Sequence, residues 1–222
     1  MGYWMYYLAF AALYWVVEHP LVLIPIALFV IFRRVIPDPW VFARTFTHRK
    51  RLRDQIRANP ANVTARRDLA SIYLERSRAK KALTVLAPAL EREPENAELL
   101  YLQGVARLRS GDADGALEPL VKAANVDPGI RFGDTYRVAG DALMKLKRHE
   151  QAIDAYEHFT DQNSSSIEGW VKLSLAHRSS GEEKPAEKAL GEARRTWSVL
   201  PGYKRRLEWR WRVRAAFASL GL

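Results

Sequence analysis

Residues 59–94 read NPANVTARRDLASIYLERSRAKKALTVLAPALEREP, and residues 95–128 read ENAELLYLQGVARLRSGDADGALEPLVKAANVDP. The two segments follow one pattern, because Pro60, Pro94 and Pro128 succeed one another at intervals of 34 residues. A fixed period of this length is typical of repeat proteins in which each repeat is a pair of helices. The period therefore sets the register for the rest of the chain.

Small residues recur at fixed places within this register. If each proline occupies position 32, the first full repeat begins at Val63, and alanine occupies position 20 as Ala82 and position 27 as Ala89. The next repeat places Ala116 and Ala123 at the same two positions. Small side chains at such spacing allow two helices to approach closely, since the distance between helix axes depends on the side chains at the contact.

Two further repeats follow. The third begins at Gly133, two residues later than the period requires, so Arg131 and Phe132 are interpreted as an insertion. The fourth begins at Ile167 and again has alanine at position 20, as Ala186. Both lack the closing proline.

Over about residues 60–200 this pattern resembles the tetratricopeptide repeat family. The resemblance implies an all-α fold, namely an α-solenoid of about four antiparallel helix pairs, with the repeats over residues 61–200. A concave face that binds peptides or helices is also implied. The expected helices span residues 63–76 and 79–92, 97–110 and 113–126, 133–146 and 149–162, and 167–180 and 183–196.

The resemblance also places a partner groove, because positions 2, 5, 9, 12 and 13 of each first helix line the concave face of such repeats. Taken from positions 5, 9 and 12, the candidate groove residues are Arg67, Ser71, Tyr101, Val105, Arg137, Asp141, Val171, Leu175 and Arg178. Positions 12 and 13 also supply Leu74, Glu75, Leu108, Arg109, Met144, Lys145 and Ser179. Apolar residues beside arginines suit an amphipathic, partly acidic helix or strand. The alternative is that some of the apolar residues contact the neighbouring repeat.

One specialised use of such a groove is not expected. Family members that clamp a C-terminal carboxylate carry Lys and Asn at positions 5 and 9 of one repeat. Here Arg67 and Ser71 occupy those positions and depart from that pairing.

The N-terminal segment is predicted to be a membrane anchor. Residues 3–36 contain only Glu18 and His19 as ionisable side chains before Arg33 and Arg34. We expect a hairpin of two short helices over residues 1–36 that turns at Glu18-His19-Pro20, since one straight helix would bury these groups in mid-bilayer. A single tilted span is the alternative, and a signal peptide is disfavoured because no basic segment precedes the apolar run.

The arginines and lysines that follow this segment place the rest of the chain in the cytoplasm, by the positive-inside rule. The predicted localisation is the bacterial inner membrane, with the repeats on its cytoplasmic side. Residues 37–60 should form a basic amphipathic helix beside the membrane, with Trp40 at the interface. Arg49, Lys50 and Arg51 are candidates for contact with anionic lipid headgroups. The alternative is a solvated helix face.

Residues 201–222 are predicted to be a basic capping helix. Tyr203, Leu207, Trp211, Ala215 and Ala218 recur every three or four residues and should cover the last repeat. The opposite side carries four candidates for contact with lipid or nucleic acid, namely Arg205, Arg206, Trp209 and Arg212. The alternative is a cap in which Trp209 packs on an arginine stem.

Composition and motifs exclude several classes of protein. The chain has no cysteine, which rules out disulfides, iron–sulfur clusters and Cys-ligated zinc. It has no phosphate-binding loop, nucleophile elbow or zinc-protease helix motif, so neither an enzyme nor a cofactor is expected. The net charge of +10 is concentrated at the ends, with +5 over residues 1–57, −2 over residues 58–193 and +7 over residues 194–222.

These observations favour a membrane-anchored scaffold or assembly factor that binds a partner peptide or helix in its groove. The alternative is a membrane-tethered adaptor that binds nucleic acid or anionic lipid through its basic ends, with nucleic acid the less favoured partner. A subunit of a larger envelope complex would have the same sequence features as the scaffold.

Overall fold

The computed structural model describes residue 7 and residues 39–219. Within these residues all regular secondary structure is helical, which confirms the all-α prediction. None of the helices they form is both long and apolar enough to cross a membrane. The predicted membrane hairpin falls almost entirely outside the described residues. The chain divides into two compact units, residues 1–51 and residues 52–222.

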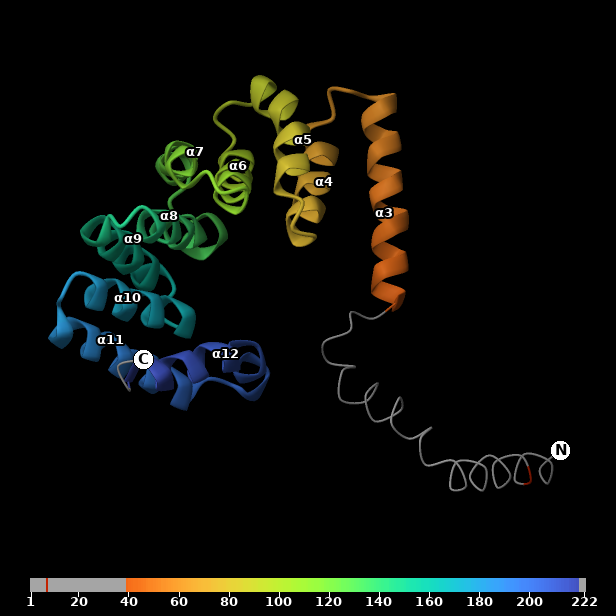
Figure 1. Cartoon of the computed structure of the whole chain (residues 1–222). Coiled ribbons are helices and arrows are strands. Elements are labelled where there is room, and N and C mark those ends of the chain that lie inside the picture. Colours follow the sequence, from red (N-terminus) through yellow and green to blue (C-terminus); the bar gives the residue numbers. More distant parts are fainter. Residues whose placement is uncertain (1–6, 8–38, 220–222) are drawn as a thin grey trace. The chain divides into compact units, whose positions relative to one another are not determined.

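The second unit is a series of helix pairs, each packed against the next (Figure 1). The pairs are α4 (Val63–Glu75) with α5 (Ala79–Arg92), α6 (Ala97–Arg109) with α7 (Ala113–Val126), α8 (Asp134–Lys145) with α9 (His149–Gln162), and α10 (Ile167–Ser179) with α11 (Glu183–Val199). Helix α12 (Gly202–Ser219) follows them, and α3 (Pro39–Ala58) precedes them. The predicted solenoid of four pairs is therefore present, and only α11 is clearly longer than expected.

Three of the first helices begin at a side-chain cap. Asn62, Asn96 and Ser166 directly precede α4, α6 and α10, and each side-chain oxygen accepts a hydrogen bond from a backbone amide three residues later. Such caps satisfy amides that have no partner within the helix. Ser166 therefore caps the helix that starts at Ile167.

The turn inside each repeat has one geometry. The residue at position 15 lies in the left-handed region in all four repeats, as Ser77 (φ 54°), Gly111 (φ 98°), Lys147 (φ 60°) and Gly181 (φ 84°). In each case the next amide donates to the carbonyl five residues before it, as Arg148 does to Leu143 at 2.9 Å. This is the Schellman arrangement that closes a helix.

The two-residue insertion forms a short 3-10 helix, η2 (Ile130–Gly133), between α7 and α8. Arg131 and Phe132 both adopt left-handed backbone angles there. The Arg131 guanidinium pairs with Glu98 and lies 4.8 Å from the centre of the Tyr101 ring. Phe132 remains 78% exposed.

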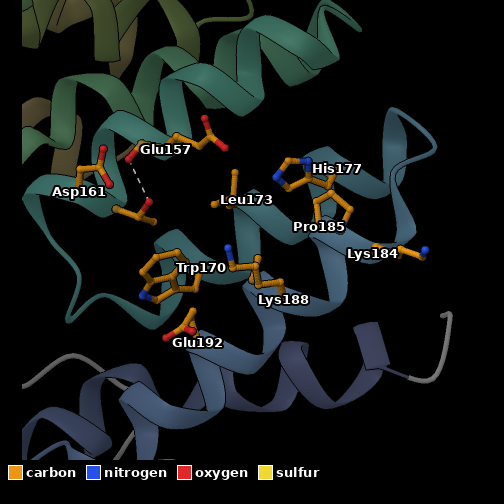
Figure 2. A pocket seen from close by; sticks show the side chains of 11 residues that line it. Glu157, Asp161, Trp170, Leu173, His177, Lys184, Pro185, Lys188 and Glu192 are labelled. Atoms are coloured by element: carbon orange, nitrogen blue, oxygen red, sulfur yellow. Dashed lines mark hydrogen bonds between the residues drawn. The ribbon is translucent and has the colours of Figure 1, made fainter.

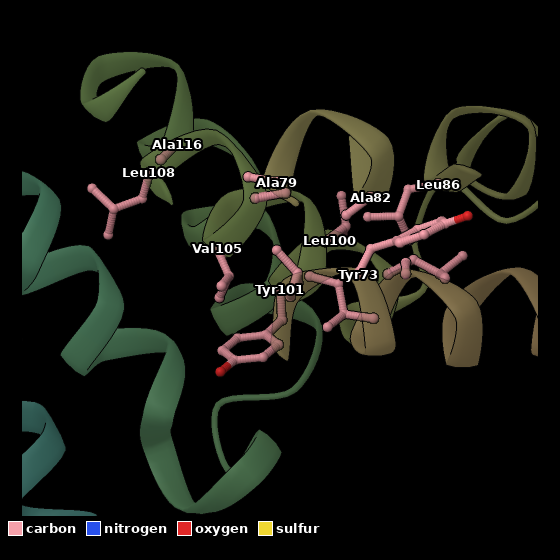
Figure 3. Packing of buried hydrophobic residues seen from close by; sticks show 14 of the residues in the cluster. Tyr73, Ala79, Ala82, Leu86, Leu100, Tyr101, Val105, Leu108 and Ala116 are labelled. Carbon is pink, nitrogen blue, oxygen red and sulfur yellow. The ribbon is translucent and has the colours of Figure 1, made fainter. Parts of the chain in front are cut away.

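The core depends on the small residues that the period predicted. Ala82, Ala116, Ala152 and Ala186, at position 20 of the four repeats, are fully buried between the two helices of their pairs. Figure 3 shows Ala82 and Ala116 in the first core cluster, among larger side chains such as Leu86. Close approach of the helices therefore requires alanine at this position.

Helix α12 covers the last repeat, but with a different face from the one predicted. Trp211, Ala215 and Ala218 belong to or pack on the last core cluster, as expected. Tyr203 and Leu207, predicted to face the same way, are 67% and 77% exposed, so that part of the prediction was wrong. Residues spaced by four rotate by about 40° per step around a helix, which turns the earlier members of the series away from the core.

At the other end of the second unit, the last turns of α3 contribute to the first core cluster. Leu52 is buried in that cluster and Ile56 packs against it. Lys50 and Arg51 are exposed and Arg49 is half-buried. The side chain of Trp40 lies outside what the structure describes.

Candidate functional site

The candidate site is a hollow of about 420 Å³ on the face formed by the first helices of the repeats. We call it the groove hollow. Helices α6 and α8 form most of it, with one residue from α10 and two from α12. It is lined by Tyr101, Val105, Leu108, Arg109, Arg137, Val138, Asp141, Met144, Lys145, Lys172, Trp211 and Arg214.

Four of the predicted groove residues come together in this hollow. Tyr101 and Val105 lie one turn apart on α6, and Arg137 and Asp141 lie one turn apart on α8. The spacing of four residues places each pair on one side of its helix. Tyr101 and Val105 are largely buried, so the hollow has an apolar wall on the α6 side.

The Arg137 guanidinium is the centre of an ionic network. It pairs with Asp134, with Asp141 at 3.3 Å and with Glu168 at 3.0 Å. The Lys172 ammonium lies 2.7 Å from both Asp141 and Glu168. Two cations thus face three carboxylates, and the network joins α8 to α10.

Two tyrosine hydroxyls extend the network. Tyr101 on α6 donates to Asp134, and Tyr156 on α9 donates to Asp141 at 2.7 Å. Burial raises the pKa of both tyrosines, and the charge of the accepting carboxylate raises it further. Both hydroxyls therefore stay protonated as donors, and the network connects four helices, α6, α8, α9 and α10.

The ion pairs of the network also keep Asp134 and Arg137 in their charged forms. Burial alone would raise the pKa of Asp134, but the hydrogen bond and charge of Arg137 outweigh it and lower that pKa. Burial alone would lower the pKa of Arg137, but Asp134, Glu168 and Asp141 raise it well above its usual range. A buried charge is tolerated when it is paired and hydrogen-bonded in this way.

Three other cations of the hollow have no carboxylate partner of this kind. The Arg109 guanidinium donates to the Leu74 carbonyl at 2.8 Å, and the Lys145 ammonium donates to the Leu108 carbonyl at 3.5 Å. The Arg214 guanidinium lies 5.0 Å from the centre of the Trp211 ring. Carbonyls and rings do not neutralise charge, so the rim of the hollow is positive.

The structure removes three predicted residues from the exposed part of the groove. Val171 is completely buried in the last core cluster, and Leu175 packs against that cluster. These two fit the alternative that apolar groove positions contact neighbouring helices. Arg178 is half-buried, and its guanidinium donates to the Ala218 carbonyl of α12. It therefore fastens the capping helix.

The two predicted residues on α4 lie outside the groove hollow. Arg67 and Ser71 are both partly exposed. The Arg67 guanidinium pairs with its neighbour Asp68 at 2.7 Å. The hollow therefore unites residues from the second, third and fourth repeats and from the cap, but none from the first repeat.

A larger hollow of about 840 Å³ lies between α9 and α11, beside α10 (Figure 2). Trp170, Leu173 and Pro185 give it apolar walls, and His177 at its edge lies 2.9 Å from Glu182. Its charged residues are mixed, with Glu157 and Asp161 opposite Lys184 and Lys188. Within residues 39–219 no group of His, Asp and Glu side chains is arranged to hold a metal ion.

The residues predicted for lipid or nucleic-acid contact on α12 divide into two groups. Trp209 is 54% exposed and Arg206 is also exposed. Arg205 is half-buried, donates to the Ser198 carbonyl at 2.8 Å and lies over the Trp197 ring. Arg212 is also half-buried. Only the first group therefore faces solvent freely.

Sequence reasoning missed several residues of the site. Asp134 and Glu168 both stand at position 2 of a repeat, which is one of the positions that line the concave face, although they were not among the candidates. The spacing of three residues between Asp134 and Arg137 was a readable signal for that pair. Lys172, Trp211 and Arg214 gave no such signal, because they enter the hollow only through the way α10 and α12 are packed.

The tetratricopeptide repeat family matches two segments of the chain, residues 68–128 and residues 134–165. These segments are therefore tetratricopeptide repeats, as the 34-residue period predicted. No match is found among curated proteins.

Solved structures of repeat proteins share the fold. A crystal structure of MamA protein superposes with a TM-score of 0.64 at 20% identity, over 70% of this chain and 84% of that one. A MamA fragment from Desulfovibrio magneticus RS-1 has a TM-score of 0.55 at 22% identity, over 60% of this chain and 75% of that one. YrrB, described as a TPR protein with an unusual peptide-binding site, has a TM-score of 0.63 at 14% identity, over 81% of this chain and 85% of that one.

Proposed function

Since residues 68–128 and 134–165 are tetratricopeptide repeats, we propose that the chain is a scaffold that holds an acidic segment of a protein partner in the groove hollow. The partner segment is an amphipathic helix or strand. The repeat fold supports a role in protein–protein interaction, and one structural relative, YrrB, is itself described as having a peptide-binding site.

The observation that carries the proposal is the combination of charge and apolar surface in the hollow. Leu108, Met144 and Trp211 offer apolar contacts to one side of a partner segment. Arg109, Lys145 and Arg214 surround them with positive charge that the ionic network does not neutralise. A segment with alternate apolar and acidic side chains satisfies both requirements.

The ionic network has a separate role in this proposal. Because Arg137 and Lys172 are occupied by Asp134, Asp141 and Glu168, they hold α8 against α10 rather than bind the partner. A preorganised site loses less conformational freedom on binding, which favours affinity. The partner therefore binds a preformed surface whose rim is positively charged.

Site-specific photo-crosslinking in intact cells tests the groove. A benzophenone amino acid at Met144, which lines the hollow, should capture a discrete partner, and mass spectrometry should place the crosslink in an acidic segment. The same amino acid at Val121, which is 54% exposed on α7, is the control. Identical products from both positions, or a crosslinked segment without acidic residues, would reject the groove.

Removal of the rim charges gives a second test. The change Arg109→Gln with Lys145→Gln keeps a neutral donor at each position but removes two charges. Hydrogen bonds to charged groups contribute about 1.5–3 kcal/mol each, so the crosslink yield at Met144 should fall at least about tenfold. Lys80→Glu with Lys81→Glu, at two exposed positions on α5, should leave the yield unchanged.

We also propose that the scaffold is anchored in a membrane, with the repeats on the cytoplasmic side. The support is the apolar sequence of residues 3–36 and the basic residues that follow it. The chain has no cysteine, so a single Val121→Cys variant reports orientation without background. A membrane-impermeant maleimide should label this cysteine only after the cells are opened. Labelling of intact cells would contradict the proposed cytoplasmic orientation of the repeats.

A further inference from the structure

The outward face of α12 carries four large apolar side chains. Tyr203, Leu207, Val213 and Phe217 are 67%, 77%, 43% and 54% exposed. At 3.6 residues per turn these four positions fall within an arc of about 120° on the helix. They therefore form an interrupted apolar strip of two pairs, Tyr203 with Leu207 and Val213 with Phe217, on a different side of α12 from the buried Ala215 and Ala218.

Three arginines, Arg206, Arg210 and Arg214, lie within the same arc. All three are exposed and fall between the apolar positions around the helix, and Arg214 also lines the groove hollow. The Arg210 guanidinium lies 6.0 Å from the centre of the Trp209 ring, which borders the strip. The outward face is thus both apolar and positively charged. Such a face needs a partner that is apolar and negatively charged.

From this we infer that the outward face of α12 docks on the surface of an anionic lipid bilayer. The apolar strip would enter the boundary between headgroups and acyl chains, where aromatic side chains are favoured. Arg206 and Arg210 are long enough to reach back to the phosphate groups from within the strip. Arg214 apart, the contact uses no residue of the groove hollow, and it does not use the N-terminal segment, so it is tested separately from the proposed scaffold function.

A second copy of the chain suits the face less well. The helices α12 and α3 of a second copy would themselves be basic, because each carries six Lys or Arg and one acidic residue. Like charges at an interface cost free energy unless they are screened. Nucleic acid would match the arginines but not the exposed Leu207 and Val213, because stacking on bases requires flat side chains.

The experiment uses the full chain reconstituted into lipid vesicles. Phe217→Cys and Val121→Cys are each labelled with an environment-sensitive fluorophore, and no native cysteine competes for the label. The two positions are matched, because both are apolar and both are 54% exposed. One set of vesicles contains phosphatidylglycerol mixed with phosphatidylcholine, and the other contains phosphatidylcholine alone.

The label at position 217 should shift to the blue, and acyl-chain quenchers should quench it, in the phosphatidylglycerol vesicles only. The label at position 121 should respond alike in both. Arg206→Gln with Arg210→Gln should lower the docking constant about 30-fold, since each basic residue near an anionic surface contributes about 1 kcal/mol. Neither arginine lines the groove hollow.

Four results would overturn the inference. The first three are an equal response of position 217 in both kinds of vesicle, a response at position 121 as large as the one at position 217, and a response that depends on protein density rather than on lipid charge. The third result would assign the face to a second copy of the chain. The fourth, a blue shift with DNA or RNA in the absence of anionic lipid, would assign it to nucleic acid.

Discussion

Lys147 and Ser77 occupy backbone conformations that glycine would adopt more easily. Both stand at position 15 of a repeat with a positive φ, where the other two repeats have Gly111 and Gly181. Gly111 and Gly181 mark their turns in the sequence, because glycine is the usual residue in the left-handed region. No such signal marks Lys147 or Ser77, where only the register reveals the same turn.

We therefore expect Lys147→Gly to raise the free energy of unfolding. The left-handed conformation costs a residue with a side chain about 1–2 kcal/mol, part of which glycine loses again through its freedom in the unfolded chain. A net gain of about 0.5–1 kcal/mol should appear in urea denaturation. Gly181→Ala is the converse control and should lower stability by about 1 kcal/mol, so a loss in both variants would contradict the turn geometry.

Gly140 is required by a close contact rather than by its backbone. A Cβ atom there would lie 2.5 Å from Cε1 of the Tyr156 ring, which is well inside van der Waals contact. Gly140→Ala should therefore destabilise the protein by about 1–3 kcal/mol, the usual cost of overpacking a core. It should also displace the Tyr156 hydroxyl from Asp141, which thermal unfolding and a crystal structure of the variant would detect.

A matched glycine exists on α11. A Cβ atom at Gly191 would meet no atom within 4 Å. Gly191→Ala should raise the free energy of unfolding by about 0.5–1 kcal/mol, because alanine is the better helix former. If both substitutions had the same sign, the crowding at Gly140 would not be the cause.

At the level of elements, the ionic network makes the packing of α6, α8, α9 and α10 depend on pH. The pKa of Asp134 is lowered in the folded state, so its contribution to stability is complete above its unfolded pKa of about 3.9 and is lost as the pH falls below that value. The pKa values of Tyr101 and Tyr156 are raised. Their contribution is complete below about pH 10 and is lost at higher pH.

The contribution of this network to the free energy of unfolding should therefore be constant between about pH 5 and pH 9. Above pH 10 it should fall by about 1.4 kcal/mol per pH unit for each of the two tyrosines. Tyr156→Phe should remove half of this alkaline slope in urea denaturation. Tyr203→Phe, which changes an exposed residue, is the control, and an unchanged slope in Tyr156→Phe would show that the network does not titrate as described.

The elements also show where sequence reasoning reached its limit. The helix boundaries followed from the 34-residue period alone, and caps such as Asn62 fix them in the structure. The buried face of α12 did not follow from the sequence, since Tyr203, Leu207 and Trp211, spaced by four residues, resembled a core stripe. Which side of a helix is buried depends on the neighbours, and the last helix of a repeat array has a neighbour on one side only.

For the whole molecule, stability should be distributed along the array. In a repeat protein each unit contacts only its neighbours, so removal of one end is felt most by the adjacent repeat. Helix α12 covers the cluster that contains Ile167, Val171 and Leu190. Its loss would leave these side chains exposed to water, and burial of each contributes about 1.5–3 kcal/mol.

A chain ending at Pro201 should accordingly lose amide protection in α10 and α11 by at least about tenfold, with little change in α4 to α7. Hydrogen exchange measured by mass spectrometry separates these regions. Leu207→Ala changes a residue of α12 that is 77% exposed, so it should alter amide protection neither in α10 and α11 nor in α4 to α7. Uniform loss of protection throughout the array would show that the repeats unfold as one unit.

The site as a whole was less predictable than the fold. The repeat register named Tyr101, Val105, Arg137 and Asp141, and these four residues line one hollow. It could not reveal which charges are already paired, because Glu168 and Lys172 reach the network from another repeat. The available cations of the hollow follow from those pairings, and pairing across repeats is a property of the assembled structure.

The insertion at Arg131 and Phe132 has a consequence for protein engineering. Residues 63–96 run from the first residue after one asparagine cap to the next asparagine cap, so the segment is a self-contained cassette. A tandem duplicate of it, spliced in after Asn96, meets the same junction at both of its ends. The boundary at Gly133 offers no such splice point, because η2 interrupts the 34-residue period there. Lengthened variants should therefore be built by insertion before η2.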